Sequence, residues 1–375
     1  MHIKVKKEQL QKGLQKVQGF TDSERSSTMP ILSHILMETE GDGLNIKATD
    51  LHTSIQVKMA CDIEEPGACT VHSKGLLDIT RELPNGDISM NIHEDGRIHI
   101  TLNRYRFKLN IMDPEEYPLI DFSKIDEGIV ISPDIIKFMI DNTFFSISQG
   151  NTGELKYTLE GAHLVTAKDG DTSYLEMATT DAKRLAFVRR PIDRTIDTSS
   201  SIIIPRKGLQ EIRRLIETSD TDASMRFTEG SLYFVSDDTI ATVRLMSGSF
   251  PEYAGVIKPD AYPIKISVDS GELLSALKVC SALLSEMSNS VRFVFSGTTT
   301  TLYAKDPEKG DVEVTVDSSQ SGPEVDITFN PKYFIDCLSM ISGEAVILLK
   351  NSEGPCLIMP GNDPDRRWLI MPMRY

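Results

Sequence analysis

Several features are scarce or missing in this sequence of 375 residues, and each absence narrows what the chain can be. No apolar run approaches the length of a membrane-spanning helix. The first ten residues, Met1–Leu10, alternate lysine with apolar residues and lack the long apolar core of a signal peptide. We therefore expect a soluble, cytoplasmic protein, and the length suggests two or three domains.

Residues that hold metals or perform catalysis are not arranged in any familiar motif. The five cysteines are odd in number and form no CxxC pair, which indicates reduced, mostly buried thiols. The seven histidines show no metal-ligand spacing, and the HExxH, GxSxG, P-loop and dinucleotide-binding motifs are missing. We expect no metal, no cofactor and no catalytic residues. An enzyme remains the opposing hypothesis, although the carboxylates at 113–116 recur loosely as Pro251-Glu252 and are typical of a structural turn.

Positive charge is also in short supply, since the net charge is −15. Taken alone, this value argues against nucleic-acid binding, because phosphate contacts depend on lysine and arginine. Net charge does not report where charges lie, however, and a ring or cleft can be basic inside and acidic outside. The objection therefore does not decide the question.

Turn-forming glycines recur at a fixed interval. Gly43, Gly170 and Gly297 each lie between two strand-like runs, and both intervals are 127 residues. A second set of hairpin glycines follows in the same order: Gly96, Gly230 and Gly354. Both series indicate a threefold internal repeat.

Helical patterns recur in the same order as the turns. Each third opens with a segment whose apolar residues are spaced by three and four, as in Leu10, Leu14 and Val17. Ser132-Pro133 and Asp269-Ser270 suit the starts of the second and third of these helices. A further helix is predicted in each third, over Ser73–Leu83, Pro205–Glu217 and Asn330–Ile341.

The remaining segments favour strands. Alternating or β-branched runs such as Ile98–Leu109, Ser231–Leu245 and Glu324–Phe329 give about eight short strands per third. The apolar end of the chain, residues 369–375, resembles 111–114 and 245–251, so it is predicted to close a sheet. Its methionines could also line a groove that binds different partners, because flexible thioethers can repack against different side chains. Two helices against antiparallel sheets in each third make an α+β fold.

Short motifs then occur in a characteristic order. They are Met29-Pro30-Ile31-Leu32, Thr180-Asp181-Ala182-Lys183-Arg184-Leu185-Ala186, Ile204-Pro205-Arg206-Lys207-Gly208, Phe250-Pro251-Glu252-Tyr253, Phe329-Asn330-Pro331-Lys332-Tyr333 and Met371-Pro372-Met373-Arg374. In this order, over the whole length, the chain resembles the bacterial DNA sliding clamp, the beta subunit of the replicative DNA polymerase III holoenzyme.

The resemblance implies three tandem clamp domains, over 1–125, 126–253 and 254–375, in a homodimer that joins head to tail as a closed ring. A heterologous contact that closes by rotation leaves no sheet edge open at the junctions. Such a ring encircles double-stranded DNA without reading its sequence and acts as a processivity factor. The implied protein partners are the replicative polymerase, the clamp loader and repair proteins. The implied location is the bacterial cytoplasm, at the nucleoid, with no membrane contact.

Basic residues on the helices are candidates for loose phosphate contacts inside such a ring, where topological linkage supplies the retention. The candidates are Lys12, Lys74, Lys137, Arg206, Lys207, Arg213, Lys278 and Lys332. The resemblance adds Arg25 and Tyr157, on loops, as contacts outside the channel. Without a ring, helical lysines are simply a solvated face.

The resemblance also implies a hydrophobic groove between the second and third domains that receives short linear peptides. The residues carried over are Leu159, Thr180, Ala182, Lys183, Arg184, Leu185, Pro251, Gly255, Val256, Met371, Pro372, Met373 and Arg374. Leucine and methionine suit an apolar anchor, and Arg184 or Arg374 could fix its orientation. Leu159 and Leu185 could equally be core residues, and Arg184 could pair with an acid.

This chain departs from the family pattern at the groove. Many relatives have Gly-His where Ala182-Lys183 stand, and some have arginine in place of Gly255. Tyr375 replaces a more common aliphatic end. Motif preferences are therefore expected to differ.

At the subunit junction, the resemblance places Phe107 and Leu109 on an edge strand, against Leu283 and Leu284 of the next subunit. Packed aliphatic anchors would stabilise the dimer, and ordinary core packing is the rival interpretation. A general interaction scaffold also stays open as a function, because it would need the groove but neither a ring nor basic helices.

Overall fold

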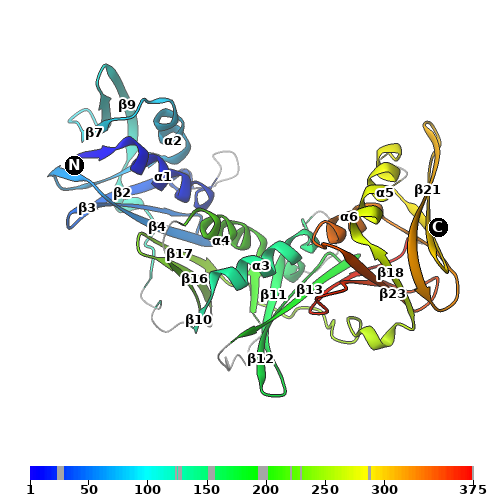
Figure 1. Ribbon diagram of the computed structural model, residues 1–375. Coiled ribbons are helices and arrows are strands. Elements are labelled where there is room, and N and C mark those ends of the chain that lie inside the picture. Colours follow the sequence, from blue (N-terminus) through cyan, green and yellow to red (C-terminus); the bar gives the residue numbers. More distant parts are fainter. Residues whose placement is uncertain are drawn as a thin grey trace. The chain divides into compact units, whose positions relative to one another are not determined.

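The computed structural model describes residues 1–22, 29–122, 125, 129–150, 157–192, 202–219, 222–228, 230–285 and 289–373. They form two compact units (Figure 1). Unit 1 comprises Met1–Ile136 and Lys207–Leu245, and unit 2 comprises Lys137–Arg206 and Met246–Tyr375. The middle third of the sequence is therefore shared between the units.

The element bounds follow the predicted threefold order. The first third contains β1 (His2–Lys6), α1 (Lys7–Val17), β2 (His34–Glu40), β3 (Gly43–Thr49), β4 (Thr53–Ala60), β5 (Asp62–Glu65), β6 (Ala68–His72), α2 (Ser73–Glu82), β7 (Asp87–Ile92), β8 (Arg97–Leu102) and β9 (Tyr105–Met112). The second contains β10 (Ile129–Ile131), α3 (Pro133–Thr143), β11 (Gly161–Asp169), β12 (Thr172–Thr180), β13 (Arg184–Ile192), β14 (Ile202–Pro205), α4 (Arg206–Thr218), β15 (Ala223–Phe227), β16 (Ser231–Ser236) and β17 (Thr239–Arg244). The third contains β18 (Ile264–Asp269), α5 (Ser270–Leu283), β19 (Val291–Ser296), β20 (Thr299–Asp306), β21 (Gly310–Ser321), β22 (Val325–Phe329), α6 (Pro331–Leu338), β23 (Glu344–Leu349), β24 (Cys356–Pro360) and β25 (Arg366–Ile370).

The helix starts confirm the predicted signals. Asp269 caps α5 by accepting the Glu272 N–H, and Asn330 caps α6 by accepting the Lys332 N–H. Pro133 is the first residue of α3, where a missing N–H costs nothing. Each predicted helix is present, although α6 ends at Leu338 and not at Ile341.

Two strand predictions were too long. The runs Ile98–Leu109 and Ser231–Leu245 are each divided by a tight turn, so that each contains a hairpin. In the first hairpin the turn residue Asn103 has φ 53°, and asparagine is among the few non-glycine residues that adopt this left-handed conformation easily. A period-2 pattern continues across such a turn, so periodicity alone could not locate it.

Sheets run across the boundaries between repeats. In the described part of unit 1, thirteen strands lie in the order β10-β15-β16-β17-β4-β3-β2-β6-β9-β8-β7-β1-β5. In unit 2, twelve lie in the order β14-β11-β12-β13-β25-β24-β23-β18-β21-β20-β19-β22. The last strand of the second third, β17, pairs antiparallel with β4, and the last strand of the final third, β25, pairs antiparallel with β13. Each unit is therefore built around a repeat junction.

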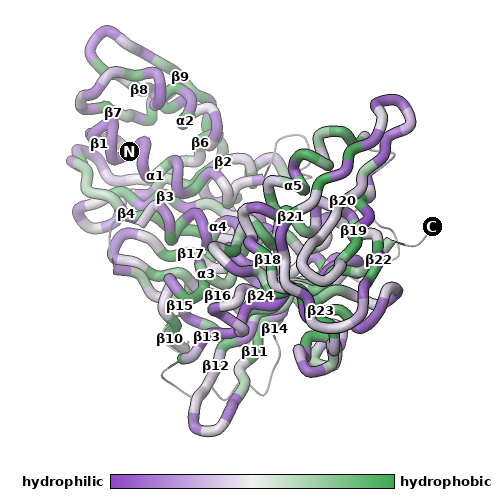
Figure 2. The backbone as a smooth tube through the Cα atoms, turned by 45° about the vertical axis from the view of Figure 1, so that its right-hand side comes forward, coloured by the Kyte–Doolittle hydropathy of each residue, from purple (hydrophilic) through white to green (hydrophobic). Residues whose placement is uncertain are grey.

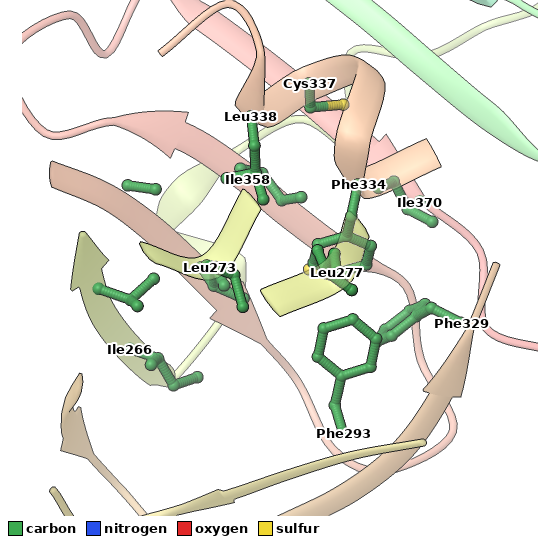
Figure 3. Packing of buried hydrophobic residues seen from close by; sticks show 14 of the residues in the cluster. Ile266, Leu273, Leu277, Phe293, Phe329, Phe334, Cys337, Leu338, Ile358 and Ile370 are labelled. Atoms are coloured by element: carbon green, nitrogen blue, oxygen red, sulfur yellow. The ribbon is translucent and has the colours of Figure 1, made fainter. Parts of the chain in front are cut away.

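Helices cover the sheets and complete the cores. In unit 1, α1 packs on α2, β3 and β4, and in unit 2, α5 packs on α6, β20 and β21. Figure 3 shows the resulting core of unit 2, in which Leu273 and Leu277 of α5 face Phe334 of α6 above the sheet. Hydrophilic residues are concentrated at hairpin tips, such as the end of β11–β12 (Figure 2).

The five cysteines are free thiols, and four of them are buried, as predicted. Burial raises the pKa of the Cys69 thiol to about 12, so that this group stays protonated at neutral pH. Among the helices of the described residues, none has both the length and the apolar character required to cross a membrane.

Candidate functional site

A capped turn joins β12 to β13 in unit 2. The Asp181 carboxylate accepts the N–H groups of Lys183 and Arg184, both at 3.0 Å. The Thr180 hydroxyl donates to the Arg184 carbonyl at 2.6 Å and accepts the Ala182 N–H. These bonds hold Ala182 at φ 68°, a left-handed conformation that costs an L-residue about 1–2 kcal/mol. The exposed Ala182 and Lys183 are therefore presented by a rigid loop.

The same turn occurs between β3 and β4 in unit 1. Asp50 accepts the N–H groups of His52 and Thr53, and Thr49 donates to the Thr53 carbonyl and accepts the Leu51 N–H. Leu51 has φ 72°. Sequence analysis missed this repeated turn, which the Thr-Asp pairs at 49–50 and 180–181 could have revealed. The turn is thus a property of the repeat, and only its surroundings differ.

The end of the chain closes the unit 2 sheet, as predicted. Strand β25 lies between β24 and β13. Beyond it, the Met371 N–H donates to the Lys183 carbonyl and the Met373 N–H donates to the Thr328 carbonyl, both at 2.9 Å. The Met371 side chain is 42% exposed, and Pro372 and Met373 are half-buried. Arg374 and Tyr375 lie outside the described residues.

The loop that follows β17 covers this region from one side. Its Tyr253 and Ile257 are buried in one cluster with Leu185 of β13 and Leu369 of β25. Pro251 is half-buried, whereas Gly255 and Val256 are exposed. Leu159, in the 3₁₀ turn Tyr157–Glu160, is buried, as are Thr180 and Leu185.

The structure therefore brings Met371 against the turn that carries Lys183, and we call the predicted groove residues of unit 2 the tail surface. Its exposed members are Ala182, Lys183, Gly255, Val256 and Met371. Leu185 lies underneath as a core residue, which agrees with the alternative interpretation of this position.

Arg184 is held by groups of its own unit. Its guanidinium donates to Asp181 at 3.0 Å, to Asp336 at 2.5 Å and to the Phe145 carbonyl, and it lies 4.6 Å from the Tyr333 ring centroid. Burial acts to lower its pKa, but the hydrogen bond to Asp336 and the two carboxylate charges outweigh burial and raise the pKa. Arg184 thus fixes the turn. Its partners Asp336 and Tyr333 are distant along the chain and could not be identified from sequence spacing.

Most of the basic residues predicted on helices point to solvent. Those that are exposed are Lys12, Lys74, Lys207, Arg213, Lys278 and Lys332. Some of the predicted residues have internal partners: Lys137 pairs with Asp141 at 2.6 Å, Lys207 with Asp50, and Arg213 with Glu217 at 3.4 Å. Arg206 donates to the Phe144 and Ile147 carbonyls and stacks on the Phe144 ring. Tyr157 is 63% exposed, and Arg25 lies outside the described residues.

A cleft of about 850 Å³ in unit 1 concentrates positive charge. Its lining includes Lys12 and Lys16 of α1, Arg81 of α2, Arg214 of α4 and Lys58 of β4. Lys16 is tied to Asp238 at 2.7 Å, whereas Lys58 is exposed. The sequence analysis missed Lys58, because it searched only helices for basic residues.

Comparison with known proteins finds three consecutive family matches along the chain. Models of the DNA polymerase III beta subunit match residues 1–121 for the N-terminal domain, 130–252 for the central domain and 256–374 for the C-terminal domain. This chain belongs to the DNA polymerase III beta-subunit family. The predicted resemblance is thereby confirmed, together with the three tandem clamp domains.

Individual relatives agree over their full length. The beta sliding clamps of Caulobacter vibrioides and Pseudomonas aeruginosa are 29% and 28% identical to this chain, and each alignment covers 100% of both proteins. A crystal structure of the C. crescentus beta sliding clamp matches with a TM-score of 0.93 at 29% identity, covering 100% of this chain and 99% of that one. A sliding clamp from Bartonella birtlesii, solved with griselimycin bound, matches with a TM-score of 0.91 at 27% identity, covering 100% of both chains.

In this beta-subunit chain, the predicted junction residues lie beside strand edges. Phe107 and Leu109 are half-buried on β9, which pairs with β8 over Tyr105–Asn110 and with β6 only at its last two residues. In unit 2, Leu284 packs against the buried core, as do Val312 and Val314. The two valines lie on the part of β21 that pairs only with β20 within the described residues. Leu283, at the end of α5, is half-buried.

Proposed function

We propose that two copies of this chain join head to tail into a ring that encircles double-stranded DNA and tethers replication and repair proteins. The family to which the chain belongs is that of a DNA polymerase processivity factor, which is not an enzyme. The proposal for the ring rests on one observation: within one chain, strand pairing already joins the first repeat to the second and the second to the third.

Corresponding strands make the two junctions inside the chain. β4, β13 and β21 each follow an aspartate-capped turn as the third strand of a meander, while β9, β17 and β25 are the last strands of their thirds. β17 pairs with β4, and β25 pairs with β13. The two members of this series left over are β9 and β21. Over Tyr105–Asn110 and Gly310–Asp317, respectively, each has only one strand partner among the described residues. Pairing β9 of one copy with β21 of another would repeat the same junction between subunits.

The two edges match in polarity as well as in position. On β9, the half-buried Phe107 and Leu109 alternate with the exposed, basic Arg106 and Lys108. On β21, Val312 and Val314 alternate with three exposed residues: Asp311, Glu313 and Thr315. An antiparallel pairing that sets Phe107 opposite Val314 and Leu109 opposite Val312 also sets Lys108 opposite Glu313, with Arg106 diagonal to that carboxylate. Two such junctions close a ring, because each copy supplies one edge of each kind.

Double-stranded DNA is the expected content of the ring. Exposed lysines and arginines on α1, α2, α4, α5 and α6, together with the basic cleft of unit 1, offer contacts to phosphates, which carry no sequence information. Weak contacts of this kind permit sliding, and closure of the ring prevents loss. We place the repeat boundaries at 125/126 and 253/254, and the protein in the bacterial cytoplasm at the nucleoid.

Retention on closed DNA tests this function directly. Loaded onto a nicked circular plasmid by a purified clamp loader with ATP, the protein should remain bound through gel filtration at a salt concentration that abolishes simple phosphate binding. Cutting the circle once should release it. Loss from circular and linear DNA alike at that salt would contradict topological linkage and favour a general interaction scaffold.

The tail surface is the proposed site for partner peptides. Its exposed Met371 donates its backbone N–H to Lys183, in the turn that also carries Ala182, and adaptable methionine suits several partners. Val256 is a further exposed apolar residue of the same unit. The proposed peptides are the clamp-binding segments of polymerase, clamp loader and repair proteins, with apolar anchors. Arg374 stays part of this proposal.

Replacing Met371 with aspartate should weaken peptide binding at least about tenfold, because an apolar anchor would then bury a charge. Fluorescence anisotropy with a labelled peptide from the polymerase of the same organism measures the change. Met340→Asp is the matched control, since Met340 is 37% exposed in the same unit and outside the tail surface. Equal binding by the Met371 variant and the wild type would contradict the assignment of this surface.

A further inference from the structure

A hairpin in unit 1 brings together two histidines and an aspartate that the proposed function does not use. Strands β7 and β8 pair with Asn91 opposite His99 and Ile92 opposite Ile98. The pairing continues into the turn, where the His93 N–H donates to the Arg97 carbonyl at 2.9 Å and Gly96 has φ 72°. The register of this hairpin therefore fixes the backbone at positions 93 and 99.

His93 and His99 lie on the same face of the hairpin because they are diagonal neighbours across the two strands. Their imidazole rings are stacked, with centroids 4.5 Å apart and an interplanar angle of 3°. Asp95, in the turn, accepts the Arg97 N–H with one carboxylate oxygen and lies 3.1 Å from His99 Nε2 with the other. One ligand atom from each of the three side chains lies within 4.8 Å of the other two.

We propose that His93, Asp95 and His99 bind a divalent transition-metal ion, with zinc or copper favoured. Two imidazole nitrogens and one carboxylate oxygen suit these ions, whereas calcium and magnesium prefer all-oxygen sites. Zinc bonds of 2.0–2.2 Å place tetrahedral ligand atoms about 3.3 Å apart. The three side chains would therefore move together by small rotations, and two of them, His93 and Asp95, are exposed.

The sequence analysis expected no metal site, since it found no familiar ligand spacing. The spacing here is H-x-D-x₃-H. It indicates a metal site only when the β7–β8 hairpin, which turns at Gly96, is known to place His93 beside His99. Water would complete the coordination, since His93 and Asp95 are exposed. The site is separate from the tail surface, and His99 lies opposite Lys108 of β9, a residue of the proposed subunit junction.

Calorimetric titration of the chelator-treated full-length protein with zinc chloride tests the proposal. The wild type should bind one zinc ion per chain saturably, and His93→Ala or His99→Ala should each reduce that affinity at least about 100-fold. His52→Ala is the matched control, because His52 is an exposed histidine on another turn of unit 1, and it should leave the titration unchanged.

A second readout distinguishes this site from binding elsewhere. Copper(II) bound to the wild type should show an electron paramagnetic resonance spectrum with two nitrogen ligands, and either alanine variant should lose one of them. Circular dichroism confirms that the variants are folded. Zinc binding that survives unchanged in the His93→Ala/His99→Ala double variant, or no saturable binding by the wild type, would overturn the proposal.

Discussion

Reversing the charges of Arg106 and Lys108 to glutamate is expected to separate the dimer into monomers. In the proposed pairing of β9 with β21, the carboxylate introduced at position 108 would face Glu313, and the one at position 106 would lie diagonally across from Glu313. Like charges set against each other cost several kcal/mol, and the closed ring contains two such junctions. We expect the dimer dissociation constant to rise at least about 100-fold, as measured by analytical ultracentrifugation.

The reciprocal substitutions provide the sharpest control. Asp311→Lys/Glu313→Lys alone should also dissociate the dimer, and mixing this variant with the Arg106→Glu/Lys108→Glu variant should restore association, because both junctions of the mixed dimer then pair opposite charges. Lys168→Glu, an exposed charge reversal on β11, should leave the dimer intact. If the reversed β9 variant stays dimeric at the concentrations at which the wild type is dimeric, β9 is not at the interface.

Arg184→Ala is expected to destabilise unit 2 by about 3 kcal/mol. Removing one member of a buried ion pair leaves the other charges unpaired, which costs about 3–5 kcal/mol. The lower end of that range applies because Asp181 and Asp336 are partly exposed, at 21% and 26%. The single tryptophan, Trp368, is fully buried in unit 2 and donates to the Asn142 carbonyl at 2.9 Å, so its fluorescence reports urea unfolding of this unit.

Two variants calibrate that measurement. Arg184→Lys keeps the charge but loses the planar fork of donors, so an intermediate loss is expected. Arg292→Ala removes an ion pair with Asp326 that is about half exposed at both ends, and a much smaller change is expected there, because solvent screens exposed charges. If Arg184→Ala shifts the Trp368 transition no more than Arg292→Ala does, the proposed structural role of Arg184 is wrong.

Local features of this fold could be predicted from the sequence. Helix starts depend on residues a few positions apart, so the caps at Asp269 and Asn330 and the proline at 133 were informative. The repeat was found because turns between neighbouring strands need special residues. The turn near Gly43 shows the limit of this approach, since the left-handed residue there is Gly41, which the spacing did not indicate.

Contacts between distant segments could not be predicted in the same way. An apolar alternating strand fits any partner of suitable polarity, so the sequence did not indicate that β17 pairs with β4 or that β25 pairs with β13. Arg184 presents the same difficulty, because Asp336 lies 152 residues away along the chain. Family resemblance placed Arg184 near a groove, but only coordinates show that its donors are engaged within the unit.

The way in which sheets cross the repeat boundaries determines where a ring of this construction can open. The β17–β4 and β25–β13 seams are held by strands of one chain, whose covalent connection keeps the two partners at a high effective concentration. A β9–β21 seam has no such tether, and its rim of exposed charges is weakened by salt. Dilution or high salt should therefore open the ring at the junctions between subunits while both compact units stay folded. A clamp loader would need to open only one of these two junctions.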